Sequence, residues 1–300
     1  MSTEFDNILY DSGDGIARIT LNRPDKRNAQ SLKLLAELND AFDLAAHDET
    51  VKVIILGANG PDFSSGHGPG GGIDLDSYKP AGTWSGFKEP GMEGHMSLEQ
   101  EFFLGFCWRW RNIPKPTIAE VKGWVIAGGL MLMWPCDIVV AADNSKFTDP
   151  VVAFGVNGVE YFAHPWEVGV RRAKEMLFTG EVITAEEAKS LGMVNRVVPL
   201  DALTQHTNEL AAHIATRPAM GLKLAKQSVN QMQDAQGMWE ALQAAMSLQQ
   251  LGHAHNQIAH GMLVDPEGGK QIQAVLKGHK APAADDGQAA ASPAKDAANK

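Results

Sequence analysis

Residues 113–143 read IPKPTIAEVKGWVIAGGLMLMWPCDIVVAAD, and this stretch decides the fold. Its segments 117–121 and 137–142 are nearly all apolar and rich in β-branched residues, a pattern typical of strands that are covered on both faces. Between them, Gly128 and Gly129 precede a short apolar run that we expect to be helical. The stretch therefore predicts a strand, a glycine-rich turn, a helix and a second strand, which is the layering of an α/β protein.

The residues before this stretch show the same alternation of strand and helix. Residues 16–21 alternate apolar and polar side chains and end at a turn that contains Pro24. Behind Ser31, a suitable N-cap, leucines and Phe42 recur every three or four residues and predict an amphipathic helix of about 16 residues. Residues 51–56 are again continuously apolar and predict a buried strand.

The second half of the chain changes character. Residues 76–98 show no sustained period, so we expect a long loop that covers a site. From Thr184 the pattern is helical, with acidic residues in the first turn and Gly192 where the helix should end. Residues 201–280 remain mostly helical by pattern, whereas residues 281–300 are rich in alanine and hold no large apolar side chain.

This organisation predicts three parts along the chain. Residues 1–200 would form an α/β core that carries the site, and residues 201–280 a helical C-terminal region. Residues 281–300 would form a disordered tail, because they cannot offset the entropy of ordering.

Composition excludes several classes of function. The 26 basic residues against 36 acidic ones give a net charge of −10, so no positive field attracts nucleic acid or an anionic membrane. The longest apolar stretch, residues 124–136, is well short of the roughly 20 residues that span a bilayer. The acidic N-terminus lacks the basic start of a signal peptide, and Cys107 and Cys136 fit no metal or disulfide motif. We therefore expect a cytoplasmic protein that binds no metal, with both thiols buried.

Two glycine-rich segments follow predicted strands. They read FSSGHGPGGGIDLD at 63–76 and KGWVIAGGLMLMWPCD at 122–137. Each alone is an ordinary tight turn, but glycine also lets a backbone approach a ligand closely, and the free N–H groups at a helix start favour negative charge. Neither segment is a nucleotide-binding motif. Two such turns facing one another would form an oxyanion hole.

These segments belong to a wider resemblance. ITLNRPDKRNA at 19–29, FSSGH at 63–67, the stretch 113–143 and FTGEVITAEEAKSLGMVNRVVP at 178–199 follow the order of motifs in the crotonase superfamily of enoyl-CoA hydratases and isomerases. The chain resembles that family from residue 10 to about residue 265. The resemblance implies a spiral of ββα units and a helical C-terminal region that packs in a homotrimer or a dimer of trimers. It also implies an acyl-CoA thioester as substrate, with no cofactor beyond the coenzyme A that the substrate carries.

The resemblance also assigns backbone donors for the thioester oxygen. The second donor falls on Gly128. The first falls on His67, which follows FSSG, although Gly72 to Leu75 also resembles a family motif and offers Ile73 instead. We favour His67, because FSSG keeps the expected distance from the preceding strand.

The same resemblance places the coenzyme A around the first motifs. Ala29 and Ser65 would line its pantetheine and adenine parts, largely through backbone atoms. Lys26 and Arg27 are available for its phosphates, although a solvated turn would explain both of them equally well.

The two glutamates that hydratases of this family use as acid and base are absent. Their positions carry Met131 and Val151, which would line the acyl site but cannot transfer protons. Glu160 lies close to the position where other members carry an alternative carboxylate, and its apolar neighbours should raise its pKa. The alternative is a structural ion pair with Arg171 or Arg172.

Three further side chains are candidates for proton transfer: Asp149, His164 and the imidazole of His67. By contrast, we expect His253, His255 and His260 to form a solvated helix face, since rings two residues apart on a helix diverge. The sequence thus predicts an acyl-CoA enzyme that stabilises an enolate with unusual proton carriers. Open alternatives are a coenzyme A-binding protein with little turnover, a C–C lyase, and a hydrolase that acts on a substrate without coenzyme A.

Overall fold

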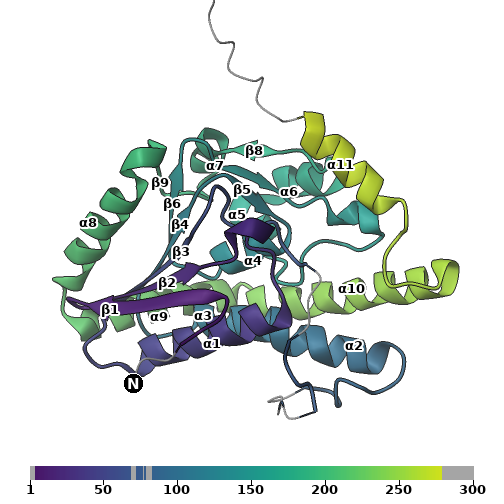
Figure 1. Ribbon diagram of the computed structural model, residues 1–300, viewed down its shortest axis with the longest axis horizontal. Coiled ribbons are helices and arrows are strands. Elements are labelled where there is room, and N and C mark those ends of the chain that lie inside the picture. The colour runs from purple at the N-terminus through teal and green to yellow at the C-terminus, as the bar shows by residue number, and fades with distance from the viewer. Residues whose placement is uncertain (1–3, 69–71, 77, 79–82, 279–300) are drawn as a thin grey trace, which may run out of the picture.

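A six-stranded sheet forms the centre of the computed structural model, which describes residues 4–68, 72–76, 78 and 83–278 (Figure 1). Its strands lie in the order β1-β2-β3-β4-β6-β9, and all neighbours except β1 and β2 are parallel. Their bounds are β1 Ile8–Gly13, β2 Ile16–Leu21, β3 Val53–Ala58, β4 Thr117–Val121, β6 Ile138–Ala142 and β9 Arg196–Val198. The predicted α/β class is confirmed.

The antiparallel pair at the sheet edge is a two-residue hairpin. Gly13 pairs with Ile16, so only Asp14 and Gly15 connect the strands. Both have positive φ, 52° and 82°, which is the geometry of a tight hairpin turn that favours aspartate followed by glycine.

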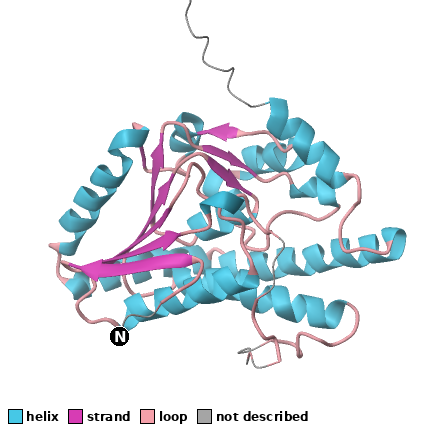
Figure 2. Ribbon diagram, in the orientation of Figure 1, coloured by secondary structure: helices cyan, strands magenta, loops and turns pink. Residues whose placement is uncertain are grey.

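Helices cover both faces of this sheet (Figures 1 and 2). On one face lies α1, Leu32–His47, whose Leu34, Leu38 and Phe42 are fully buried. The hydroxyl of Ser31 accepts a hydrogen bond from the N–H of Leu34, which confirms the predicted cap. On the other face lies α8, Leu203–Ala215.

A smaller sheet, in the order β5-β7-β8, stands beside the first. Its strands are β5 Trp124–Ile126, β7 Lys146–Thr148 and β8 Ile183–Thr184. We expected the residues around β5 to be part of a turn. The short helix α4, Gly128–Met133, follows this strand directly, so the predicted unit between 117 and 142 is present with one additional strand.

The predicted loop at 76–98 is wrong in its last part. Helix α2 spans Met92–Glu99 and continues into the π-helical segment η2, Gln100–Gly105, and into α3, Phe106–Arg111. Contacts with α10 stabilise α2 despite its weak apolar periodicity. Positions 77 and 79–82 of the expected loop lie outside the described residues.

The rest of the described chain is mainly helical. Its elements are η1 Pro24–Lys26, η3 Val151–Phe154, α5 His164–Val168, α6 Val170–Thr179, α7 Ala185–Leu191, η4 Leu200–Ala202, α9 Ala219–Ala235, α10 Met238–His260 and α11 Gly268–Gly278. The hydroxyl of Thr184 caps α7, and Gly192 ends it in a left-handed conformation, as predicted. Within the part of the chain described here, no helix is long and apolar enough to cross a membrane. The predicted tail at 281–300 lies outside the described residues.

Candidate active site

The FSSGH segment lies between the turn after β2 and the start of α4. Ser64 forms a bridge with Val125 of β5, and His67 forms one with Gln30. Between them Gly66 has a φ of 84°, and a Cβ at this position would lie 2.7 Å from the carbonyl oxygen of Ile126. Only glycine fits so close to another backbone, and this approach brings His67 beside α4.

Two backbone N–H groups are available where these segments meet. Gly128 is the first residue of α4, and its N–H, like that of His67, has no acceptor among the described residues. Ala127, directly before it, has φ 47° and ψ −115°, which is a strained conformation for a residue with a Cβ. Ile73, the alternative first donor, follows Gly72, at which a Cβ would lie 3.4 Å from the side chain of Lys33 on α1.

The imidazole of His67 is held by a buried carboxylate. Its Nε2 lies 3.0 Å from Oε2 of Glu160, and the ring stacks on Phe103 of η2 with centroids 4.2 Å apart. Glu160 is only 5% exposed, and its other oxygen accepts a 3.4 Å hydrogen bond from the amide of Gln249 on α10. A Cβ on Gly128 would lie 3.0 Å from Cε1 and 3.1 Å from Nδ1 of His67, so the Nδ1 edge of the ring faces Gly128.

This arrangement fixes the chemistry of the imidazole. An ionised carboxylate only accepts hydrogen bonds, so Nε2 of His67 carries the hydrogen, and Nδ1 is the basic nitrogen of the neutral ring. Burial by itself lowers the pKa of His67, but the charge and the hydrogen bond of Glu160, with smaller contributions from Glu99 and Asp149, outweigh it and raise the pKa above 6.5. The imidazole of His67 is therefore a stronger base than that of an ordinary histidine.

The alternative partners predicted for Glu160 lie elsewhere. Arg172 pairs with Glu175, Glu181 and Glu187, and no ion pair joins Glu160 to an arginine in the described structure.

Asp149 and His164 form a second, separate pair. His164 Nε2 lies 2.8 Å from Oδ2 of Asp149, and neither side chain has any exposed surface. Asp149 also accepts hydrogen bonds from the N–H groups of Val151 and Val159. The pair thus holds together the segment that ends in Glu160.

The residues expected around coenzyme A lie at the rim of this site. Lys26 and Arg27 are exposed in and after η1, and the carbonyl of Arg27 accepts a hydrogen bond from the N–H of Ser65. Arg27 also lies 3.6 Å from a carboxylate oxygen of Asp62. Ala29 is half-buried, 2.6 Å from where a Cβ on Gly68 would lie.

The two positions without glutamate differ in their surroundings. Met131 is 1% exposed inside α4, whereas Val151 is half-buried at the start of η3. Neither side chain can replace an acid or a base.

Sequence reasoning missed two neighbours of the pair, Phe103 and Gln249. Phe103 lies in a π-helical turn, which often marks functional sites but has no simple sequence signature. Gln249 reaches Glu160 from 89 residues further along the chain.

The expectation for the C-terminal histidines is wrong in part. His255 and His260 are exposed, but His253 is only 6% exposed and faces His95 and Glu99 of α2. The cause is tertiary, because α10 packs against α2 on the side that carries His253.

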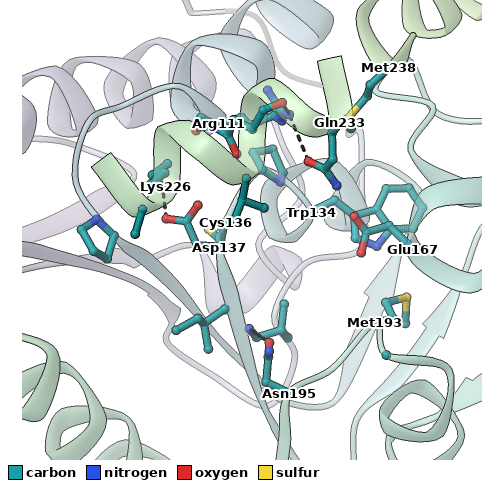
Figure 3. Close-up of a pocket in the computed structure, with 18 of the residues that line it drawn as sticks. Arg111, Trp134, Cys136, Asp137, Glu167, Met193, Asn195, Lys226, Gln233 and Met238 are labelled. Atoms are coloured by element: carbon teal, nitrogen blue, oxygen red, sulfur yellow. Dashed lines mark hydrogen bonds and ion pairs between the residues drawn. The ribbon is translucent and has the colours of Figure 1, made fainter. Parts of the chain in front are cut away.

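A cavity of about 500 Å³ lies apart from the His67 site, between α9 and residues 134–139 (Figure 3). An ion pair of 2.8 Å joins Lys226 to Asp137 at one side of it, and Arg111 bonds to Gln233 at another. Burial raises the pKa of Glu167 in this cavity to about 8. His67, Glu160 and Gly128 are not among the residues that line it.

Among the described residues, two backbone N–H groups without an acceptor lie in segments next to a His–Glu pair on an α/β framework, which is the type of arrangement that binds an oxyanion. The sequence profile of the enoyl-CoA hydratase/isomerase family matches residues 11–270. The chain belongs to this family.

Individual relatives agree with this membership. A candidate enoyl-CoA hydratase of Mycobacterium tuberculosis, EchA13, is 45% identical over 261 residues, which cover 84% of this chain and 82% of the relative. A crystal structure of a candidate enoyl-CoA hydratase from Mycobacterium smegmatis is 47% identical with a TM-score of 0.78, and covers 86% of this chain and 99% of its own. An enoyl-CoA hydratase/isomerase structure from Xanthobacter autotrophicus Py2 is 31% identical with a TM-score of 0.75, and covers 91% and 97%. The predicted superfamily and fold are confirmed.

Proposed function

We propose that this protein is an acyl-CoA enzyme that forms a thioester enolate and moves the proton with the His67–Glu160 pair. The backbone N–H groups of His67 and Gly128 hold the thioester oxygen as it gains negative charge. The observation that carries the proposal is the 3.0 Å contact between His67 and Glu160, made where the imidazole also faces Gly128.

The proton transfer follows from the orientation of the ring. Nδ1 of neutral His67 takes a proton from the carbon next to the thioester carbonyl, and the electrons of that C–H bond move onto the carbonyl oxygen. The imidazolium that results keeps its Nε2 hydrogen bond to Glu160, whose negative charge stabilises it. Return of the proton to the same carbon or to a conjugated carbon completes exchange or isomerisation.

The absence of both family glutamates argues against ordinary hydration as the main reaction. Met131 and Val151 cannot activate water, and the titratable side chain that the structure places against Gly128 is His67, which pairs with Glu160. Isomerisation needs a single group that removes and returns a proton, which this pair can supply.

The exchange of a substrate proton tests enolate formation whatever reaction follows it. Butyryl-CoA incubated with the protein in D₂O should gain deuterium next to the carbonyl, which mass spectrometry detects. Glu160→Gln should slow this exchange by about 10²–10⁴-fold while the affinity for butyryl-CoA is kept. Glu186→Gln, an exposed position on α7, is the matched control and should exchange normally.

The same experiment separates the alternatives. Binding of butyryl-CoA without exchange would favour a coenzyme A-binding protein with little turnover, and the absence of binding would favour a hydrolase acting on another substrate. Crotonyl-CoA and a 3-enoyl-CoA, followed by the absorbance of the conjugated thioester, then distinguish hydration from isomerisation.

Self-association is part of the proposal. Large apolar side chains are exposed along α9 and α10: Met220, Leu224, Val229, Met232, Leu248, Leu251 and Ile258. An apolar surface of this kind favours an interface, and we propose a homotrimer or a dimer of trimers built on the region 201–280. The two free cysteines fit the reducing cytoplasm that we propose as its compartment.

A further inference from the structure

Three side chains from two helices converge beside the proposed active site. His95 and Glu99 lie one turn apart on α2, and His253 reaches them from α10. Nε2 of His95 is 3.0 Å and Nε2 of His253 is 3.5 Å from the same oxygen, Oε1 of Glu99. All three ligand atoms lie within 4.8 Å of one another.

A hydrogen bond at the rim of this cluster fixes the tautomer of His253. Nδ1 of His253 lies 2.7 Å from the carbonyl oxygen of Leu263, which can only accept, so Nδ1 carries the hydrogen. In the neutral ring Nε2 then presents a lone pair toward a carboxylate, which is also an acceptor. Among the described residues, neither Nε2 of His253 nor Nε2 of His95 has a hydrogen-bond partner, although both are buried.

We propose that His95, Glu99 and His253 bind a divalent transition-metal ion of the zinc class. Two imidazole nitrogens and one carboxylate oxygen form a ligand set that Zn²⁺ accepts, with a fourth position left for water. In a tetrahedral site with bonds of 2.0–2.1 Å the ligand atoms lie about 3.3 Å apart. The spacings of 3.0 and 3.5 Å here are close to that value.

The surroundings match those of a metal site. A hydrogen bond from the second ring nitrogen to a backbone carbonyl, as His253 makes to Leu263, is the usual way to orient a histidine ligand. The second oxygen of Glu99 accepts a 2.6 Å hydrogen bond from the amide of Gln250, which orients the carboxylate in the same way. His95 keeps 22% of its side chain exposed, which provides a path for the ion.

Two buried acidic side chains, whose charge a metal ion would balance, lie at or next to this cluster. Glu99 and Glu160 are 4% and 5% exposed, and histidines are their only basic partners in the described structure. A bound ion would balance this charge and fasten α2 to α10, next to Gln249, which bonds to Glu160.

Metal titration of the full-length protein, first treated with a chelator, tests the proposal. Co²⁺ should produce the visible absorption of a tetrahedral site at one equivalent per chain, and Zn²⁺ should displace it. His253→Ala should weaken Zn²⁺ binding at least 100-fold in competition with a chromophoric chelator. Gln250→Leu, which removes only the support of Glu99, should weaken it about 10- to 100-fold.

His255 and His260 provide the control, because both are exposed on α10. The double variant His255→Ala/His260→Ala should bind one equivalent as tightly as the wild type. Zn²⁺ should also raise the melting temperature of the wild type and of this double variant. The absence of saturable Zn²⁺ binding in the wild type would overturn the proposal. Loss of binding in the double variant, or full binding in a folded His253→Ala protein, would also overturn it. The cluster would then be an ion pair between Glu99 and protonated His253.

Discussion

Nε2 of His67 and Oε2 of Glu160 lie 3.0 Å apart, although 93 residues separate them in the chain. The sequence predicted that His67 would donate its backbone N–H to the substrate and that Glu160 would transfer a proton with its carboxylate. In the reaction that we propose, the single residue His67 therefore donates its backbone N–H to the thioester oxygen, and its ring acts as the base toward the neighbouring carbon.

His67→Ala separates these two roles, since it removes the imidazole and keeps the backbone N–H. We expect deuterium exchange into butyryl-CoA to fall by about 10²–10⁴-fold, with the affinity for butyryl-CoA largely kept. Loss of affinity without loss of exchange at saturation would contradict the assignment.

The pH dependence follows from the direction of the pKa shift. In the proposed reaction the neutral imidazole of His67 is the base, and its pKa is raised above 6.5. The rate of deuterium exchange should therefore increase with pH, with a midpoint above pH 6.5. Glu160→Gln removes the charge that raises this pKa. The midpoint of the pH profile of its residual exchange should therefore lie at a lower pH than that of the wild type. A profile that is flat from pH 6 to 9, or one that Glu160→Gln leaves in place, would exclude His67 as the base.

Gly128→Ala adds a Cβ 2.9 Å from Oε1 of Gln30 and 3.0 Å from the His67 ring. Both contacts are with side chains that can move, so the fold should survive. The added methyl group should displace the His67 imidazole and narrow the space for the thioester oxygen next to the N–H of Gly128. Exchange should fall by about 10²–10³-fold. Gly221→Ala on α9 is the control, because its Cβ would meet no atom within 4 Å. Normal exchange in a folded Gly128→Ala protein would reject the oxyanion assignment.

Asp149→Ala leaves His164 buried without its partner and frees two backbone N–H groups. Breaking a buried pair in this way typically costs about 3–5 kcal/mol, and urea unfolding should show a loss of this size. The exposed Asp143→Ala should change stability by less than about 0.5 kcal/mol. If Asp149→Ala were as stable as the wild type but inactive, Asp149 would be catalytic.

Deletion of residues 281–300 should leave both the melting temperature and the affinity for acyl-CoA unchanged. The segment has no large apolar side chain with which to contact the rest of the protein. Loss of assembly in gel filtration would refute this expectation.

Local patterns in the sequence predicted most of the sheet. Residues 16–21 and 117–121 become strands at the expected bounds, since continuous or alternating apolar residues have few other ways to be buried. The helix behind Ser31 likewise follows from a cap and a period that depend only on neighbouring residues.

The site was predicted less completely, because its parts meet only through the fold. The sequence indicated that His67 and Glu160 were candidates, but not that they touch. His253 was expected to be solvated, since nothing in the pattern of α10 shows that α2 covers one of its faces. Helix α2 itself was missed, because Gly91 and Gly94 weaken the local helical signal and the contacts that stabilise it come from α10.

The position of α8 has a consequence for the order in which the protein matures. Val53, Ile55, Ile118 and Val140 lie on the sheet face that α8 covers with Leu203 and Ala211. While the ribosome is still making this chain, the strands up to β9 emerge before the helix that shields them. The nascent protein therefore carries an uncovered apolar face until about two thirds of its length has been synthesised, and a chaperone that binds such faces would act on it during that interval.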